Sequence, residues 1–195
     1  MTIAIDAGVQ RLHQLVWQPG EWMHAGWWQA LTLDAWHQSY RDYPECRAAI
    51  NLAIIQQRAF PCAPLPSTLN DQQQQLLGLE SRLPRLCTAL GLLAMGCPDY
   101  LLNGNWRRRL VPILGEHGCD QLLAIGKFHV SAPPLLAADQ INEQALARGL
   151  GWWRSDATHC PVWQALTLCL PPGPAESADN LGSAIPWLLR IGRFL

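Results

Sequence analysis

The segment QPGEWMHAGWWQ, residues 18–29, combines a Pro-Gly pair with three tryptophans, a methionine and a histidine. The Pro-Gly pair ends any preceding helix, because proline lacks an amide hydrogen and glycine favours turns. Tryptophans serve equally well in a hydrophobic core and as anchors of an interface. No obvious catalytic set accompanies them. The segment is therefore either a fold-defining element whose tryptophans mostly pack, or a surface that another protein covers.

The composition favours a protein that works through contacts with other proteins. Charged residues make up 15% of the 195 residues and hydrophobic residues 49%. Typical domains carry about 25% charged residues, so we expect a partner to cover part of the apolar surface. The net charge is −1, which argues against a protein that binds nucleic acid, because such proteins need a positive surface.

The seven cysteines and the N-terminal residues predict a cytoplasmic location. The cysteines are irregularly spaced and include no Cys-x-x-Cys, as expected for free thiols in a reducing compartment. The N-terminus lacks the basic and apolar regions of a secretory signal. The longest apolar, uncharged run, Leu86 to Pro98, is shorter than the roughly 20 residues that span a bilayer.

Periodic apolar residues, interrupted by Pro and Gly, predict a mainly α fold with seven to ten short helices. Helices are expected over residues 5–16, 24–40, 44–60, 70–80, 84–95, 106–114, 116–125, 139–153 and 181–194. Asn70 or Asp71, and later Asp139, are expected to cap helices. The alternation of Leu166, Leu168 and Leu170 with polar or small residues predicts at most one minor β element, near residues 166–170.

Prolines also indicate the domain organisation. The stretch FPCAPLPS, residues 60–67, holds three prolines in eight residues. It predicts an N-terminal helical unit over residues 1–60, a Pro-rich linker over 61–69 and a main helical body over 70–195, which together form one compact domain overall.

The sequence predicts no metal, no cofactor and no catalytic residue. The only close Cys and His neighbours, His117 with Cys119 and His159 with Cys160, lack the spacing of a structural zinc site. There is no Gly-x-Ser-x-Gly and no recognisable carboxylate pair. There is no phosphate-binding loop either, and Gly91, Gly96 and Gly104 are interpreted as helix-end glycines.

Two polar features have both a structural and a functional interpretation. Arg107, Arg108 and Arg109 form the only basic cluster; they are either a solvated helix face or a docking point for an acidic partner. His24 is interpreted as a hydrogen-bonded residue at a helix start, with a ligand or a pH switch as the alternative.

Three blocks of the sequence resemble the K protein family of type III secretion systems (SctK). The first is the signature aromatic-x-Pro-x-x-aromatic-x-His, and the second is LCTALGLLAMG, residues 86–96. The third begins at RGLGWW, residues 148–153, and continues from Trp163 to Pro171. The residues that carry this family signature, mostly in structural roles, are Trp17, Pro19, Trp22, His24, Trp27, Trp152 and Trp153.

The resemblance implies a non-enzymatic adaptor in the cytoplasmic sorting platform of an injectisome, needed for protein secretion. Such an adaptor links the cytoplasmic domain of the inner-membrane ring protein to the C-ring-like pod protein, which leads to the stator and the ATPase. It would lie at the cytoplasmic face of the inner membrane. Two alternatives stay open: a helical secretion chaperone or regulatory adaptor outside this family, and a thiol-dependent enzyme.

Overall fold

The computed structural model describes residues 6–61, 64–128, 136–156, 160–178 and 181–195. Within these ranges the chain forms thirteen α-helices and three 3₁₀ helices, and no strand. Nine of the described α-helices have eight or more residues, and the other four are single turns of four to six. The mainly α class predicted from the sequence is confirmed.

The α-helices are α1 (Ala7–Trp17), α2 (Pro19–Trp22), α3 (Gly26–Ala30), α4 (Asp34–Asp42), α5 (Arg47–Arg58), α6 (Asp71–Gly78), α7 (Leu83–Met95), α8 (Asp99–Leu102), α9 (Gly104–Leu114), α10 (Glu116–Ile125), α11 (Ile141–Ser155), α12 (Pro161–Leu166) and α13 (Ala184–Ile191). The 3₁₀ helices are η1 (Pro44–Cys46), η2 (Glu80–Arg82) and η3 (Thr167–Cys169).

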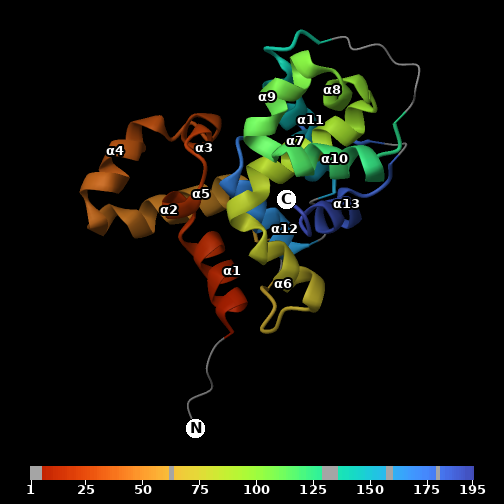
Figure 1. Ribbon diagram of the computed structural model, residues 1–195. Coiled ribbons are helices and arrows are strands. Elements are labelled where there is room, and N and C mark those ends of the chain that lie inside the picture. Colours follow the sequence, from red (N-terminus) through yellow and green to blue (C-terminus); the bar gives the residue numbers. More distant parts are fainter. Residues whose placement is uncertain (1–5, 62–63, 129–135, 157–159, 179–180) are drawn as a thin grey trace. The chain divides into compact units, whose positions relative to one another are not determined.

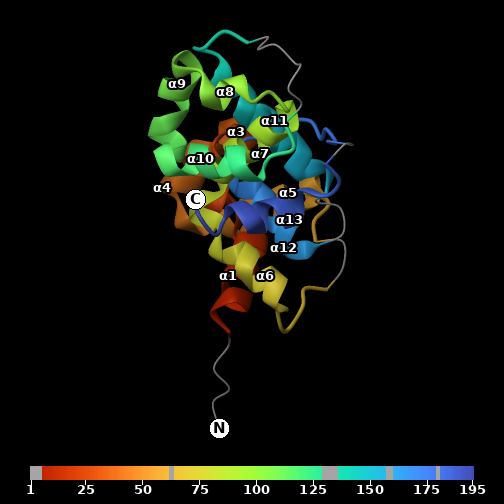
Figure 2. The ribbon, with the colours of Figure 1, turned by 45° about the vertical axis from the view of Figure 1, so that its right-hand side comes forward.

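Contacts divide the chain into two compact units. Unit 1 comprises Met1–Glu80 and His159–Pro172, and unit 2 comprises Ser81–Thr158 and Gly173–Leu195. Within unit 1, α1 contacts α6 and α12 (Figure 2). These units do not coincide with the segments 1–60, 61–69 and 70–195, which stay a prediction about domain organisation.

Local sequence explains most helix ends. Asp6 accepts hydrogen bonds from the amides of Gly8 and Val9 and so caps α1. Asn70 and Gln73 form a reciprocal capping box at the start of α6. Gly96, with φ 67°, ends α7 in the left-handed conformation that glycine adopts without steric cost. Asp139 does not cap α11, because that helix begins at Ile141 without a side-chain cap.

The helix predicted over residues 24–40 is divided into α3 and α4. The break lies at Thr32, whose φ of 54° is left-handed and therefore incompatible with a continuous helix. The break allows α4 to fold back, so that His37 stacks on Trp28 at 4.7 Å between ring centroids. Tyr40 packs on the same indole at 5.5 Å. These contacts explain the break, which the local apolar pattern did not reveal.

The β element predicted near residues 166–170 is wrong. Leu166 ends α12, and η3 follows. The alternation is misleading because the intervening Thr167 is also buried, and its hydroxyl donates to the carbonyl of Trp163 one helical turn earlier. The carbonyls of Leu168 and Leu170 accept hydrogen bonds from the backbone of His24 and the indole of Trp27 instead of from a sheet.

Unit 2 is built on α7 and α11, which lie against each other (Figure 1). The two backbones meet at Gly91 and Gly149. A Cβ on Gly91 would stand 2.9 Å from the amide nitrogen of Gly149 and still closer to the carbonyl oxygen of Ala145. A Cβ on Gly149 would meet the carbonyl of Cys87 in the same way. Gly91 is therefore a helix-packing glycine in mid-helix, and its interpretation as a helix-end glycine is wrong.

Candidate functional site

Large apolar side chains are exposed mainly in unit 1. Of the six that are exposed in the described residues, five come from α1, α2, α5 and the region around α4. This exposed apolar set consists of Trp17 (49% exposed), Trp22 (38%), Trp36 (55%), Tyr43 (54%) and Leu52 (54%). Trp and Tyr are the residue types most often found as interface anchors. The set is therefore a candidate contact with another protein.

The signature residues Trp17, Pro19 and Trp22 lie where α1 meets α2. Pro19 is buried as the first residue of α2, where its missing amide hydrogen leaves no bond unmade. The next amide, of Gly20, donates to the side chain of Asn51 at 3.0 Å. The Trp22 ring lies under the guanidinium of Arg11, 3.8 Å from ring centroid to Cζ, so one face of this exposed indole is covered by a cation.

The signature residues His24 and Trp27 fasten the start of α3 to η3. The Nδ1 atom of the exposed His24 accepts from the amide of Gly26 at 3.1 Å, which is the kind of bond expected of a histidine at a helix start. The Trp27 indole donates to the carbonyl of Leu170 at 2.9 Å. These bonds explain a structural role for both residues.

Trp152 and Trp153, from the C-terminal block of the signature, are buried in unit 2 at 1% and 0% exposure. The Trp152 indole donates to the carbonyl of Gly182 at 2.9 Å. Full burial of such a ring stabilises the fold by about 4–6 kcal/mol as an upper bound. Both residues therefore stabilise unit 2 and offer no surface to a partner.

A half-buried polar cluster in unit 1 joins α1 to η2 and η3. Arg11 donates to both carboxylate oxygens of Glu80, at 2.9 and 2.6 Å, and this hydrogen bond raises the pKa of Arg11. The Cys169 thiol also donates to Glu80. Arg58 stands over the rings of Trp27 and Phe60, and burial lowers its pKa to about 10, so it stays charged at neutral pH.

The buried thiols are weak nucleophiles. Burial raises the pKa of Cys87 and of Cys169 to about 12, and burial also raises the pKa of Cys119. A thiol with a high pKa carries little of the thiolate that attacks electrophiles. Cys62 and His159 lie outside the described residues. Among the described residues, no group of three or more His, Cys, Asp or Glu side chains is placed to hold a metal ion.

The three arginines 107–109 have different surroundings on α9. Arg107 forms ion pairs with Glu116 at 2.6 Å and Asp120 at 2.7 Å, and the hydrogen bonds to Asp120 and Glu116 raise its pKa. Within the described residues, Arg108 bonds two neutral acceptors, the carbonyl of Gly104 and the side chain of Asn105. The Arg109 guanidinium has no hydrogen-bond or ionic partner within the described part of the chain. Among the described residues, carboxylates therefore compensate the charge of Arg107 and not that of its two neighbours.

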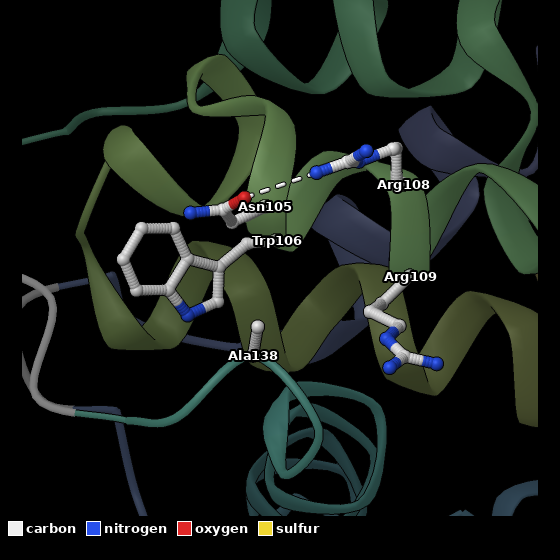
Figure 3. Close-up of a pocket in the computed structure, with 5 residues that line it drawn as sticks. All are labelled: Asn105, Trp106, Arg108, Arg109 and Ala138. Carbon is white, nitrogen blue, oxygen red and sulfur yellow. Dashed lines mark hydrogen bonds between the residues drawn. The ribbon is translucent and has the colours of Figure 1, made fainter.

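A pocket of about 550 Å³ opens beside the first half of α9 (Figure 3). Its described lining consists of Asn105, Trp106, Arg108, Arg109 and Ala138. Trp106 is held in place by a hydrogen bond from its indole to the carbonyl of Leu136 at 2.9 Å and by the Tyr100 ring. The pocket thus combines two cations with a fixed aromatic surface.

No local sequence pattern marks Trp36, Tyr43, Leu52 or Trp106 as contact residues. On α4 and α5 the inward faces are fixed by Tyr40 and by Ile50 and Ile54, so apolar residues on other faces become conspicuous once these are known. Trp106 was hidden among ten tryptophans, and its position in a pocket depends on the segment around residue 138.

None of the helices in the described ranges has the length and apolar character needed to cross a membrane. In comparisons with known proteins, no curated protein and no solved structure gives a significant match. A family model described as a type III secretion system subunit matches residues 10–172. This span includes the signature segment, the α7–α11 pair and the α9 pocket. The chain therefore belongs to this family of type III secretion system subunits.

Proposed function

We propose that this protein is a non-enzymatic adaptor of the cytoplasmic sorting platform, corresponding to the K protein of its secretion system. In this role it links the cytoplasmic domain of the inner-membrane ring protein to the C-ring-like pod protein, at the cytoplasmic face of the inner membrane. The observation that carries the proposal is the exposed apolar set of unit 1, in a chain of the type III secretion family.

The exposed apolar set supports an adaptor because a partner that covers these side chains gains binding free energy from their burial. A fully covered Trp contributes several kcal/mol to binding as a hot spot. Four of the five residues are aromatic, and aromatic residues are enriched in interfaces relative to the rest of the surface. The raised pKa values of the buried Cys87 and the partly buried Cys169 count against a thiol-dependent enzyme that would use either of these two thiols.

An adaptor needs at least two separate contact surfaces, and the chain offers two candidates of different chemistry. The exposed apolar set lies in unit 1, and the arginine-lined pocket lies in unit 2. Binding through the first should depend little on salt, whereas binding through the second should weaken as salt rises. The two contacts can therefore be separated by experiment.

The test is co-purification of the full chain with the ring protein's cytoplasmic domain and, separately, with the pod protein. Size-exclusion chromatography with light scattering, at low and physiological salt, reports each complex. We expect at least one complex, and we expect Trp17→Ala with Trp36→Ala to weaken one of the two at least about tenfold. Leu102→Ala, which removes an exposed apolar side chain from unit 2, is the matched control.

The outcomes separate the adaptor from its alternative. Absence of both complexes, with a folded protein, would overturn the adaptor proposal and favour a secretion chaperone, which would bind exported substrates instead. Equal binding by the double variant and the wild type would remove the exposed apolar set from the interface.

A further inference from the structure

We infer that the pocket beside α9 binds an acidic segment of a partner protein, with carboxylates on Arg108 and Arg109 and an apolar side chain against Trp106. The inference rests on the proposed function only for the statement that the ligand is part of a protein. It assigns a site and a ligand class to two arginines whose guanidinium groups meet no carboxylate among the described lining residues.

The described lining of the pocket carries positive charge from Arg108 and Arg109 and no carboxylate. Arg107 and its two carboxylate partners, Glu116 and Asp120, carry a net charge of about −1 together, so this cluster is satisfied. Arg108 and Arg109 line the pocket with exposed guanidinium groups that face no carboxylate among the described lining residues. The N-terminal turns of α9 add partial positive charge at the same place.

The second argument is the shape and chemistry of the lining. Figure 3 shows Arg108 and Arg109 extending from the same helix while the Trp106 ring and Ala138 occupy another part of the wall. A guanidinium pairs with a carboxylate through two parallel hydrogen bonds, which fixes both distance and direction. The pocket volume of about 550 Å³ lies within the range of ligand sites, and it exceeds the space that a single ion needs.

The third argument is pre-organisation. The indole of Trp106 is fixed by its bond to Leu136 and by the Tyr100 ring at 5.9 Å between centroids. The Arg108 guanidinium is steered by Asn105 at 3.0 Å. Because these side chains are already ordered, the site loses less conformational entropy when a ligand binds.

A protein segment fits this site better than a nucleic acid. Nucleic-acid-binding proteins combine several phosphate contacts over a basic surface, whereas this chain has a net charge of −1 and the described lining of its pocket has two arginines. A single apolar wall beside two cations matches a short stretch in which acidic residues flank an apolar one.

The test uses the full chain and a short fluorescein-labelled peptide with glutamates on both sides of a leucine. Fluorescence anisotropy at low salt should show binding that the same peptide with glutamines in place of glutamates lacks. R108Q with R109Q should weaken binding at least about tenfold. R193Q, which removes an exposed arginine elsewhere in unit 2, should leave the affinity within about twofold of wild type.

Several results would overturn the inference. These are no binding of the acidic peptide, equal binding of the glutamine peptide, an equal loss in R193Q, or tighter binding of a single-stranded oligonucleotide of equal charge. If the double variant proves unfolded, R109Q alone gives the answer, because the Arg109 guanidinium makes no bond within the described residues.

The same variants separate this inference from the proposed function. If ring or pod protein binds wild type and R108Q with R109Q equally, the pocket is not the contact while the adaptor role stands. If the peptide binds but neither protein does, the pocket stands and the adaptor role fails.

Discussion

The two units use their tryptophans differently. Unit 2 buries Trp152 and Trp153 almost completely and buries most of Trp106 and Trp187. Unit 1 leaves three of its tryptophans exposed, and no described tryptophan outside unit 1 is exposed to that degree. Unit 1 also buries Trp28 and Trp163, at 3% and 0% exposure. Tryptophan therefore stabilises the fold in both units and is strongly exposed only in the described part of unit 1, so tryptophan content alone does not locate an interface.

The largest effect is expected where the backbones of unit 2 touch. Gly149→Val should lower the free energy of unfolding by about 4 kcal/mol or more, because its side chain would meet the carbonyl of Cys87 and force α7 from α11. Urea unfolding followed by circular dichroism measures the loss. Gly104→Ala, where nothing lies within 4 Å of the added Cβ, should change stability by less than about 0.5 kcal/mol. A Gly149 variant as stable as Gly104→Ala would contradict the close approach.

The next prediction compares one tryptophan from each unit. Trp153→Ala should cost about 3–5 kcal/mol, because the ring is fully buried. Trp36→Ala should cost less than about 0.5 kcal/mol, because 55% of its surface is already exposed. Chemical unfolding of both variants under identical conditions gives the two values. Equal losses would mean that Trp36 belongs to the core.

Alkaline pH should destabilise unit 1 through the partly buried thiol of Cys169 and unit 2 through the buried thiol of Cys87. Burial raises the pKa of Cys87 and Cys169 from 9.0 to about 12, so between these values the folded chain holds protons that the unfolded chain has released. Stability is thus unaffected by these thiols below pH 9 and falls as pH rises toward 12, by at most about 1.4 kcal/mol per pH unit for each thiol. Unfolding at pH 8 to 11 should show a shallower decline in Cys87→Ala and in Cys169→Ala. An unchanged slope in both variants would show that these thiols do not titrate as described.

The smallest effect concerns one ion pair in each unit. Glu80→Gln should cost about 1–2 kcal/mol, because Arg11 and Glu80 are only 24% and 22% exposed and share two hydrogen bonds. Glu176→Gln in unit 2 should cost less than about 1 kcal/mol, because Arg148 and Glu176 are 36% and 48% exposed. Thermal unfolding ranks the two variants. The reverse order would show that exposure does not decide the strength of these pairs.

Local signals predicted the parts of the fold that depend on neighbouring residues. The capping residue Asn70, the stop at Gly96 and the start of α10 after Gly115 follow from side-chain chemistry within one turn. The break at Thr32 depends on the packing of α4 back onto Trp28. The helical state of residues 166–169 accompanies contacts with His24 and Trp27, far away in the sequence. Sequence periodicity carries no information about such contacts, and this explains both errors.

The candidate sites show the same limit. The basic cluster was visible in the sequence, but only the fold shows that Glu116 and Asp120, on the next helix, compensate Arg107. The described lining of the pocket brings no carboxylate to Arg108 or Arg109. Likewise, Gly91 and Gly149 become meaningful only when α7 and α11 are seen to meet. Pairing between distant residues was therefore the missing information in both cases.

The division of unit 1 between two stretches of sequence has a consequence for biosynthesis. Leu168 belongs to the core cluster around Trp28, and α12 contacts α1. A ribosome that adds about 5–20 residues per second therefore needs roughly 4–17 s between Gly78 and Pro161 before this core can close. During that interval the apolar faces of α1 and α5 await their covering segment, while α7 to α11 are being made. The nascent chain thus completes the core of unit 1 late, and a product truncated before α12 would lack the segment that closes it.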